Sequence, residues 1–200
     1  MTTDIITTGR TRALSLSTIA FTACFAVWTI FSIIGIQIKS DLGLSETQFG
    51  LLVGAPVLTG SLIRLVLGIW TDQIGGRIVL TLVMLSAAVA TALLSFAYDY
   101  PTFLLAALGV GIAGGSFSVG VAYVSRFFPK ETQGTALGIF GMGNVGAAVT
   151  KFAAPAVMVS YGWQVVAYVW AAVLAALAIV FYLTAQDDPD LRARRAERRP

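Results

Sequence analysis

Arg64, Asn144 and Lys151 are polar or cationic residues inside stretches that are otherwise apolar enough to enter a bilayer. Asn144 and Lys151 are seven residues apart, which is two helical turns, so their side chains share one face of a helix. A charged side chain inside hydrocarbon is costly unless it lines a cavity or meets a partner. Arginine presents five donors in a planar fork, which suits planar oxyanions. These residues therefore predict a positively charged pathway for an anion within the membrane.

Small residues surround the three polar positions. Glycine removes the side chain, so that another helix backbone or a small ligand can approach closely. A second band of small residues surrounds Phe117, whose ring could pack on a flat ligand. The predicted substrate-binding residues are Arg64, Asn144, Phe117, Lys151, Gly141, Gly143 and Gly146.

Each of these residues also has a purely structural interpretation. The long side chains of Arg64 and Lys151 could extend to the two membrane interfaces while their stems lie in hydrocarbon. Asn144 could hydrogen-bond a neighbouring helix, and Phe117 could belong to ordinary small-residue packing. The acidic side chains avoid the middle of the apolar stretches, so no carboxylate proton relay is visible. A negative partner for Arg64 must then be the substrate or protein outside this sequence.

The composition indicates an integral membrane protein. Hydrophobic residues make up 57% of the 200 residues and charged residues only 12%, whereas a soluble domain is nearer a quarter charged. Apolar runs of about 20 residues predict transmembrane helices. The fold class is therefore all-α, with six spans at about 14–37, 46–71, 78–98, 102–125, 133–158 and 165–184.

Several function classes are excluded by residue type. A single cysteine rules out a disulfide within one chain, and without histidine or a cysteine cluster no metal site or cofactor is predicted. No nucleophile–base pair is visible, so an enzyme is not expected. The basic residues lie mostly in loops and in the C-terminal tail, where membrane topology explains them, so no nucleic-acid partner is expected.

Short loops between six spans predict an antiparallel bundle with both termini on one side. With the termini inside, ten cationic loop and tail residues are cytoplasmic and only Lys39 is outside, as the positive-inside rule requires. The expected organisation is a cytoplasmic N-terminus at 1–12, a six-helix bundle at 13–185 and a cytoplasmic tail, or the start of a central loop, at 186–200.

The turn after the second span carries a distinctive set of residues. Asp72 lies at a helix C-terminus, where the helix dipole disfavours an anion. A specific partner is therefore predicted: the N-terminus of the third span, Arg77 or Arg126. This turn resembles the signature between helices two and three of the major facilitator superfamily. The resemblance implies twelve helices in two six-helix halves, of which this chain is similar to the first. It also implies a role in conformational gating for Gly68, Asp72, Gly75, Arg77 and Arg126.

A narrower resemblance is to the nitrate/nitrite porter family. Arg64 and the segments 138–146, 114–118, 28–32 and 127–129 carry this likeness. It implies that Arg64 contacts the anion directly, that Asn144 hydrogen-bonds near it and that Phe117 packs on it. The glycines of the fifth helix would let helices rock past each other. With Lys151, the chain resembles the branch of this family that is associated with nitrate–proton symport.

The expected function is therefore transport of nitrate or nitrite by alternating access, with this chain as the N-terminal half. The expected partners are the lipid bilayer, the anion, protons and a second six-helix half, from the same gene, a separate gene or a second copy of this chain. The expected location is the inner (plasma) membrane. Two alternatives stay open: transport of another small anion within the same superfamily, and a non-transporting protein that binds other membrane proteins.

Overall fold

The computed structural model describes residues 2–189, with side chains from residue 9 onward. In this part of the chain six apolar helical segments are long enough to cross a membrane, as predicted. The tail arginines of the predicted segment 186–200, which begin at Arg192, lie outside the described residues. The six segments are Gly9–Leu42, Glu46–Ile74, Gly76–Leu94, Tyr100–Ser125, Lys130–Tyr161 and Trp163–Thr184.

The first span is made of two helices, α1 (Thr2–Trp28) and α2 (Phe31–Leu42). Two hydroxyl groups stabilise the break between them by hydrogen bonds to main-chain carbonyls. The Thr29 hydroxyl donates to Phe25 O at 3.0 Å, and the Ser32 hydroxyl donates to Thr29 O at 2.7 Å. Such local bonds compete with regular helix geometry. The first span is therefore interrupted at the end of α1, next to Trp28.

Local sequence signals begin and end the next helices. Ser45 and Gln48 form a capping box at the start of α3 (Glu46–Ile74). Gly75 ends this helix with a φ of 94°, a conformation that favours glycine, and α4 (Gly76–Leu94) follows at once. Asp99 caps α5 (Tyr100–Val110).

The fourth and fifth spans are each interrupted by a short 3₁₀ segment that contains glycine. The fourth span consists of α5, η1 (Gly111–Gly115) and α6 (Ser116–Ser125). The fifth consists of α7 (Lys130–Gly141), η2 (Met142–Val145) and α8 (Gly146–Tyr161). A 3₁₀ stretch inside a long helix often marks a functional hinge or a strained sequence. The last span, α9 (Trp163–Thr184), is regular.

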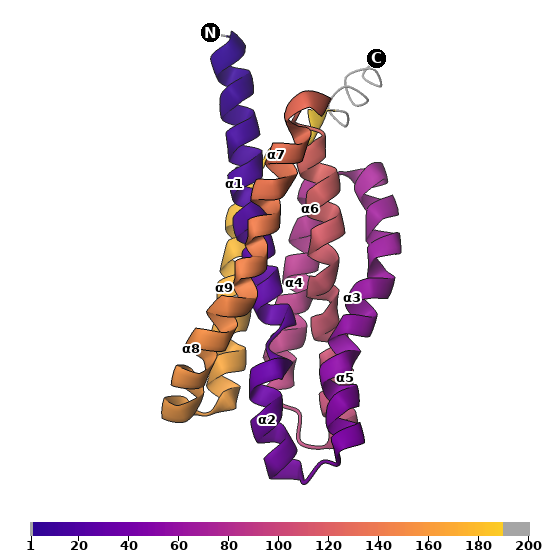
Figure 1. Cartoon of the computed structure of the whole chain (residues 1–200), viewed down its shortest axis with the longest axis vertical. Helices are drawn as coiled ribbons and strands as arrows, with labels where there is room; N and C mark the ends of the chain where they lie inside the picture. Colours follow the sequence, from indigo (N-terminus) through magenta and orange to yellow (C-terminus); the bar gives the residue numbers. More distant parts are fainter. Residues whose placement is uncertain (1, 190–200) are drawn as a thin grey trace.

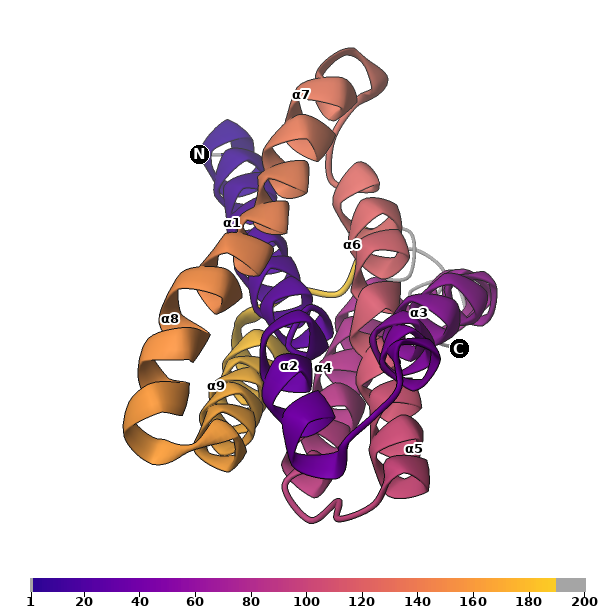
Figure 2. The same ribbon diagram turned by 60° about the horizontal axis from the view of Figure 1, so that its bottom comes forward.

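The helices form an elongated bundle around α1 (Figures 1 and 2), and α1 packs against α6, α7, α8 and α9. The other major contact joins α4 to α9. The start of α1 and the end of α9 lie at the same end of the bundle, as six spans require. We call this the termini end. The helix α3 lies at one side of the bundle and α8 at the other, with α1 between them (Figure 2).

Candidate functional site

Arg64 projects from α3 toward the interruptions of the first and fourth spans. Its side chain is half-buried, and its Nε donates a hydrogen bond to Gly114 O in η1 at 3.2 Å. The guanidinium carbon lies 6.0 Å from the ring centre of Trp28 and 5.9 Å from that of Phe117. These distances are those of cation–π contacts. The fold therefore holds the arginine between two aromatic rings and a main-chain carbonyl.

Glycines allow Trp28 to lie beside Arg64. The indole Nε1 donates to Pro56 O at 2.9 Å, which fixes the plane of the ring. A Cβ on Gly60 would lie 3.0 Å from this nitrogen, and a Cβ on Gly114 would lie 2.8 Å from it. Larger residues at either position would displace the tryptophan. The small residues near Arg64 are therefore needed to place an aromatic ring.

Three phenylalanine rings form a wall that continues from Phe117 away from Arg64. The ring of Phe21 stacks on that of Phe140 with centres 4.9 Å apart, and it lies 5.5 Å from Phe117. A Cβ on Gly120 would lie 2.2 Å from the Phe140 ring, and a Cβ on Gly143 would lie 2.4 Å from the Phe21 ring. Glycine at both positions makes room for the wall, which packs α1, α6 and α7 together.

The guanidinium of Arg64 keeps free hydrogen-bonding capacity. Within residues 2–189, only its Nε has a hydrogen-bond partner, and no carboxylate pairs with it. The two terminal nitrogens therefore present a free pair of parallel donors. A charge at this position needs a counter-ion when it is removed from water. The arrangement can bind a small oxyanion through two charge-assisted hydrogen bonds.

The other predicted binding residues lie on the fifth span. Asn144 is exposed, and its amide nitrogen donates to Gly141 O at 2.8 Å. Lys151 is exposed and has no hydrogen bond or ion pair with the residues that the structure describes. Neither side chain contacts Arg64 in this part of the chain. Their predicted contact with the anion thus depends on a pathway that extends beyond the Arg64 site.

The three predicted binding glycines of the fifth span have different surroundings. A Cβ on Gly146 would lie 2.0 Å from Thr22 O and 2.8 Å from Ala26 N in α1, and Gly143 packs on Phe21. A Cβ on Gly141 would meet nothing within 4 Å. Gly143 and Gly146 thus let two helices approach closely, whereas Gly141 faces open space.

Arg126 joins the predicted gating turn to the end of α9. Its Nη2 pairs with Asp72, so Arg126 is the partner among the three predicted ones. Its Nη1 lies 2.7 Å from Asp188 Oδ2 and donates to Thr71 O at 3.3 Å. The Asp188 side chain is fully buried, whereas that of Asp72 is 71% exposed. Gly76 N, at the start of α4, also donates to Asp188 at 3.4 Å, where the helix dipole favours a carboxylate.

Arg77 binds the end of α9 instead of Asp72. Its Nε and Nη2 donate to Tyr182 O at 3.0 and 2.7 Å, and its Nη1 lies 3.4 Å from Asp187 Oδ1. Gly75 supplies the backbone conformation of the turn, and Gly68 faces open space. Asp187, Asp188 and Trp28 were not among the site residues predicted from the sequence. For the two aspartates, the available signal was their position directly after the last apolar span.

Six apolar spans around an intramembrane arginine define a helical membrane protein of the transporter class. Residues 16–200 match the family model of the Major Facilitator Superfamily, so the chain belongs to that superfamily, a family of transporters and not of enzymes. A solved structure of a bacterial homologue of the human lysosomal transporter Spinster, inward-facing and occupied, matches with a TM-score of 0.79 and 21% identity. The match covers 90% of this chain and 45% of that one, which confirms the predicted fold of one half.

Curated relatives share more of the sequence. The "Probable nitrate/nitrite antiporter NarK1" of Thermus thermophilus is 43% identical, over 86% of this chain and 42% of its own length. The "Probable nitrate transporter NarT" of Staphylococcus carnosus is 34% identical, over 90% and 46%. The "Nitrite extrusion protein" of Bacillus subtilis is 34% identical, over 85% and 43%. The chain thus spans less than half the length of these relatives, and it aligns with their first half.

Proposed function

We propose that this chain forms the first half of a transporter that moves nitrate, nitrite or both across a membrane by alternating access. The observation that carries the proposal is the guanidinium of Arg64, half-buried within a membrane span and with both terminal nitrogens free among the described residues. The relatives' names point to the same two anions.

The surroundings of Arg64 suit a small planar anion. Two parallel donors match two oxygens of nitrate or nitrite, and the bond from Nε to Gly114 O orients the fork. The rings of Trp28 and Phe117 flank the guanidinium and would contact the flat face of the ion. Binding would compensate the charge of Arg64. Asn144 and Lys151 would add a hydrogen bond and a second positive charge along the pathway.

Alternating access requires a second six-helix half that rocks against this one. The gate at the termini end would be the ion pair of Arg126 with the exposed carboxylate of Asp72, which is accessible to a partner domain. Arg126 would keep the buried Asp188 when Asp72 exchanges partners. We place the protein in the inner (plasma) membrane with both termini cytoplasmic, because the loop cations then lie inside.

The substrate is tested by uptake into liposomes that contain the purified native product. Nitrate and nitrite should enter, and excess acetate should not compete. Arg64→Gln should abolish uptake, whereas Arg10→Gln, the same loss of charge near the start of α1, should leave it unchanged. Uptake that is inhibited by excess carboxylate and not by excess nitrate would indicate that the substrate is another small anion. Stimulation by an inward proton gradient that is lost in Lys151→Gln would support symport.

The second half is tested by the mass of the native product in its own membrane. A mass near twice 21.1 kDa would mean that one polypeptide carries both halves. A mass near 21.1 kDa with a stable membrane partner would indicate a separately encoded half or a second copy. A monomer of that mass without any partner would contradict alternating access.

A second candidate is a non-transporting protein that binds other membrane proteins. The observation in its favour is a row of glycines on α7, Gly134, Gly138 and Gly141, each facing open space. Such rows let another helix approach closely. Arg64→Ala separates the two candidates, because it should abolish anion binding in a transporter and leave partner binding intact in an interaction protein.

A further inference from the structure

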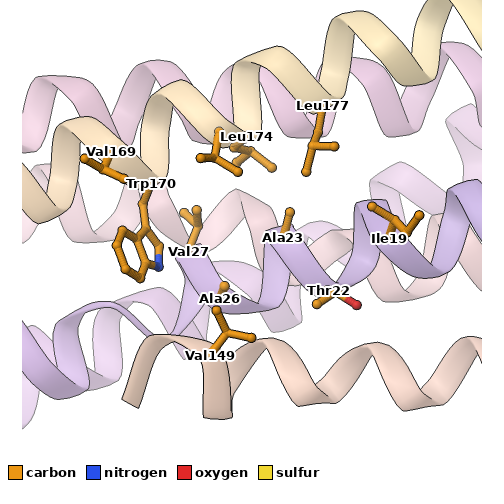
Figure 3. A pocket seen from close by; sticks show the side chains of 11 residues that line it. Ile19, Thr22, Ala23, Ala26, Val27, Val149, Val169, Trp170, Leu174 and Leu177 are labelled. Atoms are coloured by element: carbon orange, nitrogen blue, oxygen red, sulfur yellow. The ribbon is translucent and has the colours of Figure 1, made fainter. Parts of the chain in front are cut away.

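An apolar groove of about 410 Å³ lies between α1, α8 and α9, away from Arg64 (Figure 3). Ile19, Ala23 and Val27 form its floor along α1, while Leu174 and Leu177 approach from α9. The groove is deep where α1 carries alanine instead of a larger side chain. Its lining is almost entirely hydrocarbon.

A hydrogen-bond chain closes the groove at the end that is farther from the termini end of the bundle. Trp170 Nε1 donates to Thr150 Oγ1 at 2.9 Å, and the Thr150 hydroxyl donates to Ala26 O at 2.6 Å. These bonds join the three helices and satisfy the polar atoms of both side chains. The indole ring of Trp170 therefore ends the groove with an apolar surface (Figure 3). The hydroxyl of Thr22, which also lines the groove, donates to Thr18 O at 2.8 Å and so does not call for a polar ligand.

A cationic side chain, that of Arg12, lies above the groove toward the termini end. Arg12 is seven residues before Ile19 and eleven before Ala23, so it lies on the same face of α1 as the groove floor. It is exposed and has no ion pair with the residues described here. It stands about 10 Å from Ile19 along the helix, at 1.5 Å per residue. The site thus combines a positive charge at the termini end with an apolar groove next to it.

We propose that this groove binds one anionic phospholipid from the leaflet at the termini end. The acyl chain lies along the groove and the phosphate lies at Arg12. From Ile19 to Val27 the groove floor is about 12 Å long, close to the roughly 15 Å hydrocarbon depth of one leaflet. Charge complementarity selects an anionic headgroup, because each arginine near an anionic lipid surface contributes about 1 kcal/mol.

The shape of the groove disfavours a protein occupant. A transmembrane helix is about 10 Å wide with its side chains, whereas the groove between the three helices offers only about 410 Å³. The glycines that face open space for a close helix contact, such as Gly138 and Gly141, lie on α7 and not in this groove. A single hydrocarbon chain fits such a groove. Bound lipid would also keep α1, α8 and α9 together.

Native mass spectrometry of the purified full chain in detergent tests the proposal, with phosphatidylglycerol and phosphatidylcholine of the same chain length as probes. We expect one retained phosphatidylglycerol, bound about fivefold more tightly than phosphatidylcholine, which corresponds to about 1 kcal/mol. Arg12→Gln should remove this preference. Arg10→Gln, which removes the same charge from another face of α1, should keep it.

Two variants fill the groove from different helices. Ala23→Phe adds a ring from α1, and Val173→Trp adds bulk from an exposed position on α9; each should remove the retained lipid. Ala92→Phe, in a separate groove between α4 and α9, is the matched control and should behave as the wild type. Lipid that persists in both groove-filling variants would overturn the proposal. Equal losses in Arg10→Gln and Arg12→Gln would also overturn it, since they would indicate diffuse attraction to the surface.

Discussion

Replacing Gly146 by alanine should weaken the contact between α1 and α8. The new Cβ would lie 2.0 Å from Thr22 O, about 1.4 Å short of the 3.4 Å at which ordinary contact begins. It would also lie 2.8 Å from Ala26 N. Both neighbours are main-chain atoms of α1, so rotation of a side chain cannot relieve the clash. The two helices must instead move apart.

The cost follows from two opposing contributions. Overpacking a close contact costs about 1–3 kcal/mol, and a main-chain neighbour places the cost near the upper value. Alanine regains about 1 kcal/mol over glycine in a helix. The net loss in free energy of unfolding is therefore about 2 kcal/mol. For a chain of this size it lowers the unfolding temperature by about 4–8 °C.

A built-in probe reports unfolding in this experiment. Cys24 is the sole cysteine of the sequence and is fully buried, so a fluorogenic maleimide reacts only as the bundle opens. Gly141→Ala is the matched control, because its Cβ meets nothing within 4 Å; it should be neutral or raise the unfolding temperature slightly. Equal unfolding temperatures for the two variants would refute the close packing of α8 on α1.

Three further changes have expected outcomes in the same unfolding assay. Asp188→Asn should cost about 3–5 kcal/mol because the carboxylate is buried and paired, whereas Asp72→Asn should cost less than about 1 kcal/mol; equal costs would contradict this. Hydrogen bonds from the Thr102 side chain and backbone lower the pKa of Asp99. The Asp99 cap therefore stabilises α5 at pH values above the ordinary carboxyl pKa, and this stabilisation is lost as the pH falls through the lowered pKa. An Asp99→Asn variant whose unfolding temperature depends on acid pH as that of the wild type does would refute this. Thr150→Val should cost about 1–3 kcal/mol by leaving the indole N–H of Trp170 unpaired and removing one of two hydroxyl donors to Ala26 O; an unchanged unfolding temperature would count against this hydrogen-bond chain.

Hydropathy predicted the existence of the helices better than their details. The apolar runs identified all six spans because the cost of exposing polar groups to lipid dominates membrane structure. They did not predict that α1 begins at Thr2, since a polar stretch can be helical outside hydrocarbon. They also gave no sign of η1 and η2. Those segments depend on hydrogen-bond choices at glycines that only the packing of neighbouring helices decides.

The candidate site was predicted unevenly for a similar reason. Arg64 was identifiable from its type alone, because an arginine within an apolar run is costly. Trp28 could not be placed beside it without knowing that Gly60 and Gly114 leave space for the indole. The pairing of Asp188 with Arg126 joins residues far apart in the sequence. Such pairings depend on the order in which the helices pack around α1.

Nitrate binding to purified wild-type protein and to Arg64→Gln, measured by titration calorimetry, tests the central proposal most directly. The wild type should bind nitrate, and Arg64→Gln should bind it at least about 100-fold more weakly, because two charge-assisted hydrogen bonds are lost. Arg64→Lys should lie between them, since lysine keeps the charge without the planar fork. Unchanged affinity in Arg64→Gln would contradict the assignment of Arg64 as the anion site.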